Sequence, residues 1–281
     1  MSTILQDTEY SAEAISTVLT SSGEFLRALR WEGPDGGVSH REIKKFKETV
    51  GFSLHILRAL KDVLDDELVF LECSCGKSYL AFALNRILKE LDGMKCTFYG
   101  VDVSEALVEK CRRIAVTLDY DNMDFSLGRT REFKLPGEKK IDIVLALHAC
   151  DSATDEAVAR GIRLDAAYIM VVPCCHNQVR GQIRSTQPLK DLTDFGPLRY
   201  RFADLLTDAL RAQVLMGAGY HVTFHEIVPP TVTPKNLVIT ARRLRSGKKK
   251  GMDGYRRLCH QFGVRSILEK FLPEHFNGED G

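Results

Sequence analysis

The fold is decided by the stretch from Leu68 to Leu84, which reads LVFLECSCGKSYLAFAL. Its first four residues predict an apolar strand, residues 72–78 a tight polar turn, and residues 79–84 the start of a helix. In α/β proteins, a strand, a small-residue turn and a helix bring a nucleotide-like ligand to the helix N-terminus. The turn therefore predicts a ligand site, and two kinds fit it: a phosphate-binding P-loop and a site for S-adenosylmethionine (SAM).

The P-loop is the less favoured of the two sites. It requires a glycine, four residues, and then Gly-Lys-Ser/Thr. Gly76-Lys-Ser78 matches the end of this pattern, but Leu71 stands where the first glycine is needed. Without that glycine the loop cannot surround phosphates with backbone N–H groups. A P-loop protein also needs an aspartate at the end of a later strand, whereas Asp142 lies at the beginning of one.

Composition restricts the class of protein. The chain has 281 residues, of which 44% are hydrophobic and 27% are charged, as in soluble globular proteins. Its net charge of +1 gives no indication of a nucleic-acid partner. We expect no membrane segment, since no apolar run approaches ~18 residues, and no signal peptide. Eight cysteines without a disulfide-like density suit a reducing, cytoplasmic location.

Seven apolar strands are predicted, most of them separated by helices. The strands cover residues 68–71, 96–102, 123–127, 141–147, 167–172, 220–228 and 236–242. Helices are predicted over residues 1–30, 41–64, 79–91, 104–118 (with Ser104 as its cap), 152–161, 199–216 and 255–271, and a loop over 177–197. Apolar strands alternating with helices predict a parallel sheet covered on both faces. The last two strands lack an intervening helix, so they are expected to pair antiparallel.

The predicted fold class is therefore α/β, with a seven-stranded Rossmann-like sheet that ends in an antiparallel pair. This layout resembles that of class I SAM-dependent methyltransferases. We expect an N-terminal helical extension over residues 1–64, the methyltransferase domain over 65–245, and a basic tail with a helix over 246–281. The lysines and arginines between Arg242 and Arg257 could neutralise phosphates, which makes RNA an expected partner.

The predicted cofactor-binding residues follow successive strands. They are Glu72, Ser74, Gly76, Ser78, Asp102, Gly128 and Leu147. The first four occupy an acid-x-Gly-x-Gly-x-Gly pattern in which serine replaces the outer glycines. Since serine does not adopt positive φ freely, SAM affinity depends on whether the turn still forms. Asp102 is expected to bind the ribose hydroxyls, although it could instead cap the helix that follows.

Two further polar segments follow the fourth and fifth strands. They are His148-Ala-Cys150-Asp151-Ser-Ala-Thr-Asp155 and Pro173-Cys174-Cys175-His176. Three roles are open for them. Cys150, Cys174, Cys175 and His176 could bind zinc, although adjacent cysteines on an extended chain point in opposite directions. A cysteine could be a nucleophile activated by a histidine. Alternatively, His148, Asp151 or His176 could take a proton from the methyl acceptor, or the rim could be unreactive packing.

These two segments resemble a methyltransferase-domain family that pairs His-x-Cys-Asp/Gly-x-Ala-Thr-Asp with Cys-Cys-His. The family includes tRNA 2′-O-methyltransferases, and Thr-Pro-Lys235-Asn236-Leu is similar to its branch with a glutathione-transferase C-terminal domain. The resemblance implies SAM as cofactor, methyl transfer to tRNA or rRNA, and no metal ion. It places His148, Cys150, Asp151, Pro173, Cys174, Cys175 and His176 at the acceptor pocket. A small-molecule or protein acceptor, or a non-catalytic scaffold on this fold, remains an alternative.

Overall fold

One mixed sheet forms the centre of the molecule. The computed structural model describes residues 10–31, 38–61, 67–137, 139–147, 149–183, 189–245 and 251–277. Its strands are β1 (Glu67–Cys73), β2 (Lys95–Asp102), β3 (Met123–Leu127), β4 (Ile143–Leu147), β5 (Tyr168–Val172), β6 (Tyr220–Glu226) and β7 (Leu237–Arg243). They lie in the order β3-β2-β1-β4-β5-β7-β6. Strands β1 to β5 pair in parallel, and β7 pairs antiparallel with β5 and β6, which confirms the predicted fold class.

The strand order reverses at β1, which lies between β2 and β4. In open α/β sheets, ligands bind outside the carboxyl ends of the strands at such a point. The turn that follows β1 therefore begins at the position where this topology forms a crevice. The register of β4 and β5, in which Leu147 pairs with Val172, brings the segments after these two strands to the same edge.

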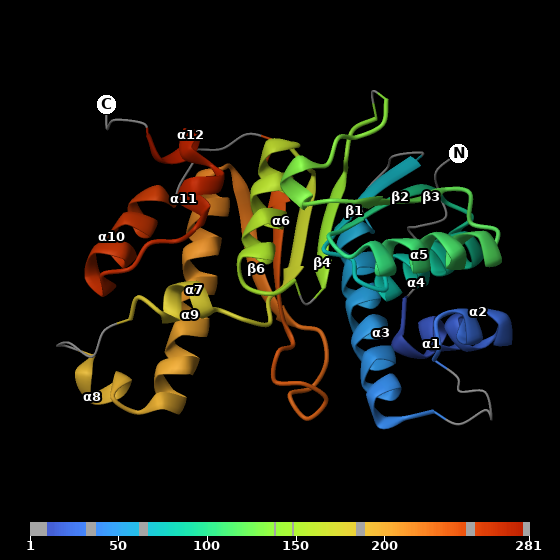
Figure 1. Cartoon of the computed structure of the whole chain (residues 1–281), viewed down its shortest axis with the longest axis horizontal. Helices are drawn as coiled ribbons and strands as arrows, with labels where there is room; N and C mark the ends of the chain where they lie inside the picture. The colour runs from blue at the N-terminus through green and yellow to red at the C-terminus, as the bar shows by residue number, and fades with distance from the viewer. Residues whose placement is uncertain are drawn as a thin grey trace.

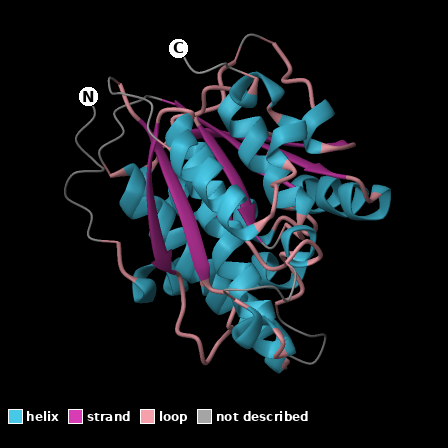
Figure 2. Ribbon diagram, turned by 90° about the vertical axis from the view of Figure 1, so that its left-hand side faces the viewer, coloured by secondary structure: helices cyan, strands magenta, loops and turns pink. Residues whose placement is uncertain are grey.

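Alternate residues of the central strands enter two hydrophobic cores. In β1, Leu68 and Phe70 belong to one core, and Val69 and Leu71 to the other. This alternation follows from the pleat of a strand, which points successive side chains to opposite faces. Figure 2 shows helices on both sides of the central strands.

Helices from the first half of the chain cover one face. They are α1 (Ala12–Thr20), α2 (Gly23–Ala28), α3 (His40–Leu60), α4 (Tyr79–Ile87), which a short π-helix (Leu88–Asp92) extends, and α5 (Glu105–Thr117). A capping box between Ser39 and Glu42 begins α3. Trp31 stacks on Tyr79 at 5.6 Å between ring centroids, which joins the N-terminal helices to α4. The N-terminal helices thus share a core with the sheet (Figure 1).

Helices from the second half cover the other face. They are α6 (Ser152–Arg163), α7 (Asn177–Arg180), α8 (Lys190–Thr193), α9 (Gly196–Gly217), α10 (Met252–Phe262), α11 (Leu268–Phe271) and α12 (Pro273–Phe276). Their core contacts come mainly from α6, α9 and the α10–α11 region. No helix in the described ranges is both long and apolar enough to cross a membrane.

Three predictions of local structure were wrong. The predicted loop over residues 177–197 contains α7, α8 and the start of α9, whose first turn carries Pro197. Proline suits the first turn of a helix, where its missing N–H has no partner to lose. The predicted helix 255–271 is divided because Gly263, at φ 64°, ends α10. The predicted N-terminal helix is two helices that meet at Ser21 and Ser22, and residues 1–9 lie outside the described ranges.

Candidate active site

The turn after β1 adopts a left-handed backbone at three alternate positions. Ser74, Gly76 and Ser78 have φ angles of 52°, 58° and 52°. These are the positions at which the predicted pattern carries glycine. Each serine there costs about 1–2 kcal/mol relative to glycine, because its Cβ approaches the backbone. The two serines therefore keep the left-handed backbone that glycine would adopt at these positions. A Cβ added to Gly76 would meet no atom within 4 Å, so a ligand can approach the backbone at this point.

Glu72 lies beneath the turn. Its carboxyl group is buried and accepts a hydrogen bond from the Ser78 hydroxyl. Burial raises the pKa of Glu72 to about 7, and the hydrogen bonds from Ser78 and the Ala81 backbone offset only part of this rise. Glu72 was predicted to contact the cofactor. In the structure its carboxyl group is buried and supports the turn through Ser78.

Asp102 connects the turn to the end of β2. Its Oδ2 accepts the Gly76 N–H at 2.8 Å, and its Oδ1 accepts the Ser104 N–H at 2.9 Å. The side chain of Ser104, which was predicted to cap α5, makes no capping hydrogen bond. Asp102 therefore supports the start of α5 itself. Since each carboxylate oxygen has two lone pairs, one on each remains to accept a ribose hydroxyl.

Two apolar side chains that the sequence analysis missed flank Asp102. Val103 is 67% exposed and Leu127, at the end of β3, is 52% exposed. Gly128 follows with φ 151°, and its N–H donates to the Asp102 carbonyl at 2.9 Å. The sequence could have indicated them, since each is an apolar residue at or just after the end of one of two adjacent strands. Leu147, which was also predicted to bind the cofactor, is half-buried at the end of β4, where both cysteine segments begin.

Three cysteines converge at the ends of β4 and β5. The Sγ atoms lie 3.3 Å apart for Cys150 and Cys174, 3.7 Å for Cys174 and Cys175, and 3.9 Å for Cys175 and Cys150. The expectation that adjacent cysteines point apart was wrong, because β5 ends at Val172 and the chain is no longer extended. Partial burial raises the pKa of both Cys150 and Cys174, contrary to what an activated nucleophile requires.

His176 turns away from the cysteines and is buried between two carboxylates. Its Nδ1 lies 2.8 Å from Asp204 Oδ1, and its Nε2 lies 3.0 Å from Asp208 Oδ1. Burial lowers its pKa, but the adjacent carboxylates of Asp204 and Asp208 outweigh burial and raise the pKa overall. With a carboxylate beside each nitrogen, the buried ring has no nitrogen directed at the cysteine segments, so it is poorly placed to accept a substrate proton.

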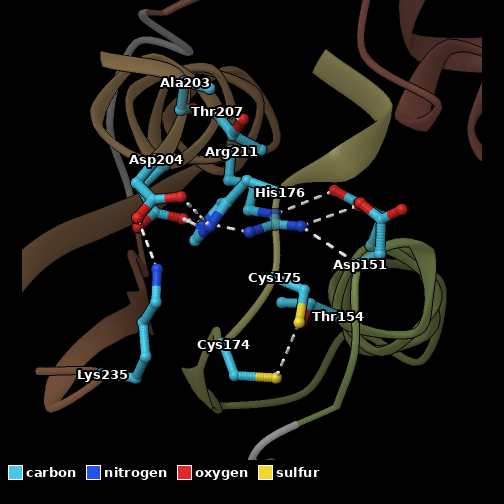
Figure 3. A network of polar contacts seen from close by, with 12 residues as sticks. Asp151, Thr154, Cys174, Cys175, His176, Ala203, Asp204, Thr207, Arg211 and Lys235 are labelled. Carbon is cyan, nitrogen blue, oxygen red and sulfur yellow. Dashed lines mark hydrogen bonds and ion pairs between the residues drawn. The ribbon is translucent and has the colours of Figure 1, made fainter. Parts of the chain in front are cut away.

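The carboxylates around His176 belong to a chain of alternating charges (Figure 3). Lys235 pairs with Asp204 at one end. At the other end, the fully buried Arg211 donates to Asp208 at 3.0 Å and to both oxygens of Asp155 at 2.9 Å. Three cations and three carboxylates alternate through this chain, so buried charge is compensated at each step.

The remaining predicted pocket residues are Pro173, Asp151 and His148. Pro173 is buried. Asp151 is half-buried, has φ 52°, and accepts the Gln178 N–H at 3.1 Å through Oδ1. His148 lies outside the described ranges. Asp204, Asp208 and Arg211 were not predicted as partners, although their spacing of four and three residues places them on one face of α9.

Comparison with known proteins identifies the domain that contains these residues. Residues 44–182 match the family described as "Methyltransferase domain". These residues form a methyltransferase domain. The match runs from α3 to the end of α7, so it includes the turn, Asp102 and both cysteine segments. The match covers just under half of the chain, and together with the seven-stranded fold it supports a SAM-dependent methyltransferase.

Solved structures of methyltransferases are similar at low identity. Magnesium protoporphyrin IX methyltransferase from Synechocystis PCC 6803, with bound SAH, is 18% identical over 83% of this chain and 100% of that one, with a TM-score of 0.47. A SAM-dependent methyltransferase from Aquifex aeolicus is 15% identical over 73% and 97%, with a TM-score of 0.43. An rRNA methylase from Streptococcus thermophilus is 13% identical over 66% and 91%, with a TM-score of 0.39. No match to this sequence was found among the curated proteins.

Proposed function

We propose that this methyltransferase transfers the methyl group of SAM to an RNA, with the cofactor at the turn after β1 and the acceptor at the ends of β4 and β5. The left-handed backbone at Ser74, Gly76 and Ser78 is the observation that carries the proposal. It supports cofactor binding because a narrow turn exposes its backbone to the ligand. The two serines retain this conformation despite its cost, which is expected where a turn has a function.

The proposed cofactor site has three parts. The methionine end lies over the open backbone at Gly76. The remaining lone pairs of Asp102 accept the ribose hydroxyls, as carboxylates at this position do in nucleotide-binding folds. The adenine lies between Val103 and Leu127, whose exposed side chains would lose contact with water on binding.

Asp151 is the proposed proton acceptor. Bound SAM supplies a methyl group that its sulfonium makes electrophilic, and the acceptor must lose a proton as it is methylated. Among the described candidates, His176 has both nitrogens against carboxylates. The carboxylate of Asp151 is half-buried, and its Oδ1 is oriented by the Gln178 N–H. A positioned carboxylate at this edge can accept a proton from a hydroxyl or an amine.

RNA is supported by the family resemblance of the two cysteine segments. The chain also exposes arginines, which begin near the opposite edge of the sheet, since Arg242 pairs with Tyr168 at the start of β5. These are Arg242, Arg243 and Arg245 at and beyond the end of β7, and Arg256 and Arg257 on α10. Guanidinium groups at a surface release counterions from a phosphate backbone, and their contribution falls as salt rises. Lys248, Lys249 and Lys250, which were part of the same prediction, lie outside the described ranges.

The proposal is tested in two steps. Titration calorimetry with SAM and SAH measures cofactor binding, and we expect binding by the natural sequence. Methyl transfer from labelled SAM is then measured on total RNA, on a protein extract and on a small-molecule extract. We expect label in RNA, sensitive to ribonuclease and reduced in Asp151→Asn. Label in only the protein or only the small-molecule extract would assign a different substrate.

A non-catalytic protein on this fold is the second candidate, because Ser74 and Ser78 both carry backbone strain. The double change Ser74→Gly and Ser78→Gly distinguishes the two candidates. If SAM binds only to this variant, the natural chain is a scaffold that has lost its cofactor. If both proteins bind SAM, the methyltransferase proposal is supported.

A further inference from the structure

We propose that Cys150, Cys174 and Cys175 bind a thiophilic divalent metal ion, for which Zn²⁺ is the probe. The site lies at the ends of β4 and β5 and goes beyond the proposed methyl transfer, which assigns no metal to the chain. Its three sulfur atoms all lie within 4.8 Å of one another. Three convergent sulfurs are a donor set that zinc prefers in proteins.

The distances between the sulfur atoms fit a single tetrahedral ion. With Zn–S bonds of about 2.3 Å and tetrahedral angles, two ligand sulfurs lie about 3.8 Å apart. The three observed distances are 3.3, 3.7 and 3.9 Å. One ion can therefore contact all three sulfurs with shifts of a few tenths of an ångström. The trio fills three of the four positions of a tetrahedron.

The backbone on both sides of the trio is shaped to bring the sulfurs together. Residues 173–176 follow the end of β5 in an irregular conformation, which turns Cys174 and Cys175 to the same side (Figure 3). On the other segment, Asp151 has φ 52°, a conformation that costs a non-glycine residue about 1–2 kcal/mol. The chain thus maintains a strained residue directly beside Cys150.

Polar contacts of neighbouring residues also hold both cysteine segments in place. His176 follows Cys175 directly and is held between Asp204 and Asp208. The Thr154 hydroxyl donates to the carbonyl of Ala149, the residue before Cys150, at 2.6 Å. Metal affinity depends on such supporting contacts, since they hold the ligands in place before the ion arrives. Cys150 is exposed, so an ion can enter from solvent.

The chemistry of binding balances with no reagent other than the ion. Three S–H bonds break, three metal–sulfur bonds form, and three protons pass to solvent. One Zn²⁺ with three thiolates has a net charge of −1. The fourth position remains for water or for a heteroatom from outside the trio. The ion removes the repulsion that three adjacent thiolates would otherwise have.

The test uses the full chain, purified under reducing conditions and stripped with a chelator. We expect one Zn²⁺ per chain by elemental analysis, and three protons released per ion in a weakly buffered solution. Co²⁺ should give sulfur-to-metal charge-transfer bands in the near ultraviolet. Cys150→Ser, Cys174→Ser and Cys175→Ser should each lose more than about 100-fold in affinity, because even supporting residues contribute 10–100-fold.

Cys259→Ser is the matched control, since Cys259 is also partly exposed but lies on α10, outside the trio. It should bind Zn²⁺ as the natural chain does. Circular dichroism shows whether each variant folds, and proton release by the natural chain stands independently of the variants. The proposal is overturned by absent or substoichiometric binding, by equal affinity in the three variants, or by a Cys150–Cys174 disulfide with no metal uptake after reduction. None of these measurements requires SAM or RNA, so failure here is distinct from failure of the proposed function.

Discussion

The hydroxyl of Ser78 donates a hydrogen bond to the carboxyl group of Glu72, and both groups are buried beneath the turn that follows β1. Ser78 stands where the cofactor pattern carries glycine, and its φ of 52° is unfavourable for serine. The hydroxyl, however, is one of two donors to a buried carboxyl group, beside the Ala81 backbone, and losing such a donor costs about 1–3 kcal/mol. At residue 78 the hydrogen bond thus offsets the strain. Ser74 has the same strain, and its hydroxyl makes no hydrogen bond to Glu72.

Changes at the two serines should therefore affect stability in opposite directions. Ser74→Gly removes the strain and should raise the free energy of unfolding by about 1 kcal/mol, after the entropy that glycine adds to the unfolded chain. Ser78→Ala keeps the unfavourable φ and leaves the carboxyl group with only the Ala81 backbone as donor. It should lower the free energy of unfolding by about 1–3 kcal/mol. Urea denaturation of both variants measures this, and shifts of the same sign would contradict it.

Glu72 should make stability depend on pH. Its pKa is raised from 4.5 to about 7 in the folded protein, so between these values the folded state holds a proton that the unfolded state has released. Stability should fall as pH rises through this window and then level off, by on the order of 3 kcal/mol in total. Glu72→Gln cannot ionise and should lack this part of the profile. Denaturation at pH 5, 6, 7 and 8 gives both profiles, and parallel curves would exclude Glu72 as the source.

Sequence patterns predicted the fold because the central strands are buried on both faces. Continuous apolar runs identify such strands, as in β4, where Ile143–Val144–Leu145–Ala146 are all buried. Residues 177–197 were misjudged because glycine and proline indicate both loops and helix ends. Only helix geometry decides between them, as Pro197 in the first turn of α9 shows.

The candidate site was predictable where one segment forms it, and less so where distant segments meet. The positions of Ser74, Gly76 and Ser78 follow from a spacing within one turn. The partners of His176 come from α9, and no local pattern links that helix to β5. The approach of Cys174 to Cys150 depends on how the chain bends after Val172, which residue types alone do not specify. Whether these pocket residues act in catalysis stays a prediction.

The buried charge chain should be sensitive to the loss of one carboxylate. Asp155→Ala leaves the fully buried Arg211 without the pair of oxygens that it contacts at 2.9 Å. Removing one partner of a buried ion pair costs about 3–5 kcal/mol. Since Asp208 still contacts Arg211 at 3.0 Å, the free energy of unfolding should fall by about 3 kcal/mol. Glu274→Ala is the control, because it breaks an exposed pair with Arg163 that should contribute less than about 1 kcal/mol. Urea denaturation compares them, and equal losses would show that Arg211 does not depend on this partner.

Asp102 should determine how tightly the ribose of the cofactor is held. Asp102→Asn keeps the shape of the side chain but removes its charge and one acceptor oxygen. A hydrogen bond to a charged group contributes about 1.5–3 kcal/mol, so the Kd for SAM should rise about 10- to 100-fold. SAH and adenosine should weaken by the same factor, since all three share the ribose. The control is Asp124→Asn, which changes an exposed carboxylate on β3. Calorimetry provides each Kd. If Asp102→Asn lowers stability while the Kd values stay unchanged, Asp102 serves only the turn and the start of α5.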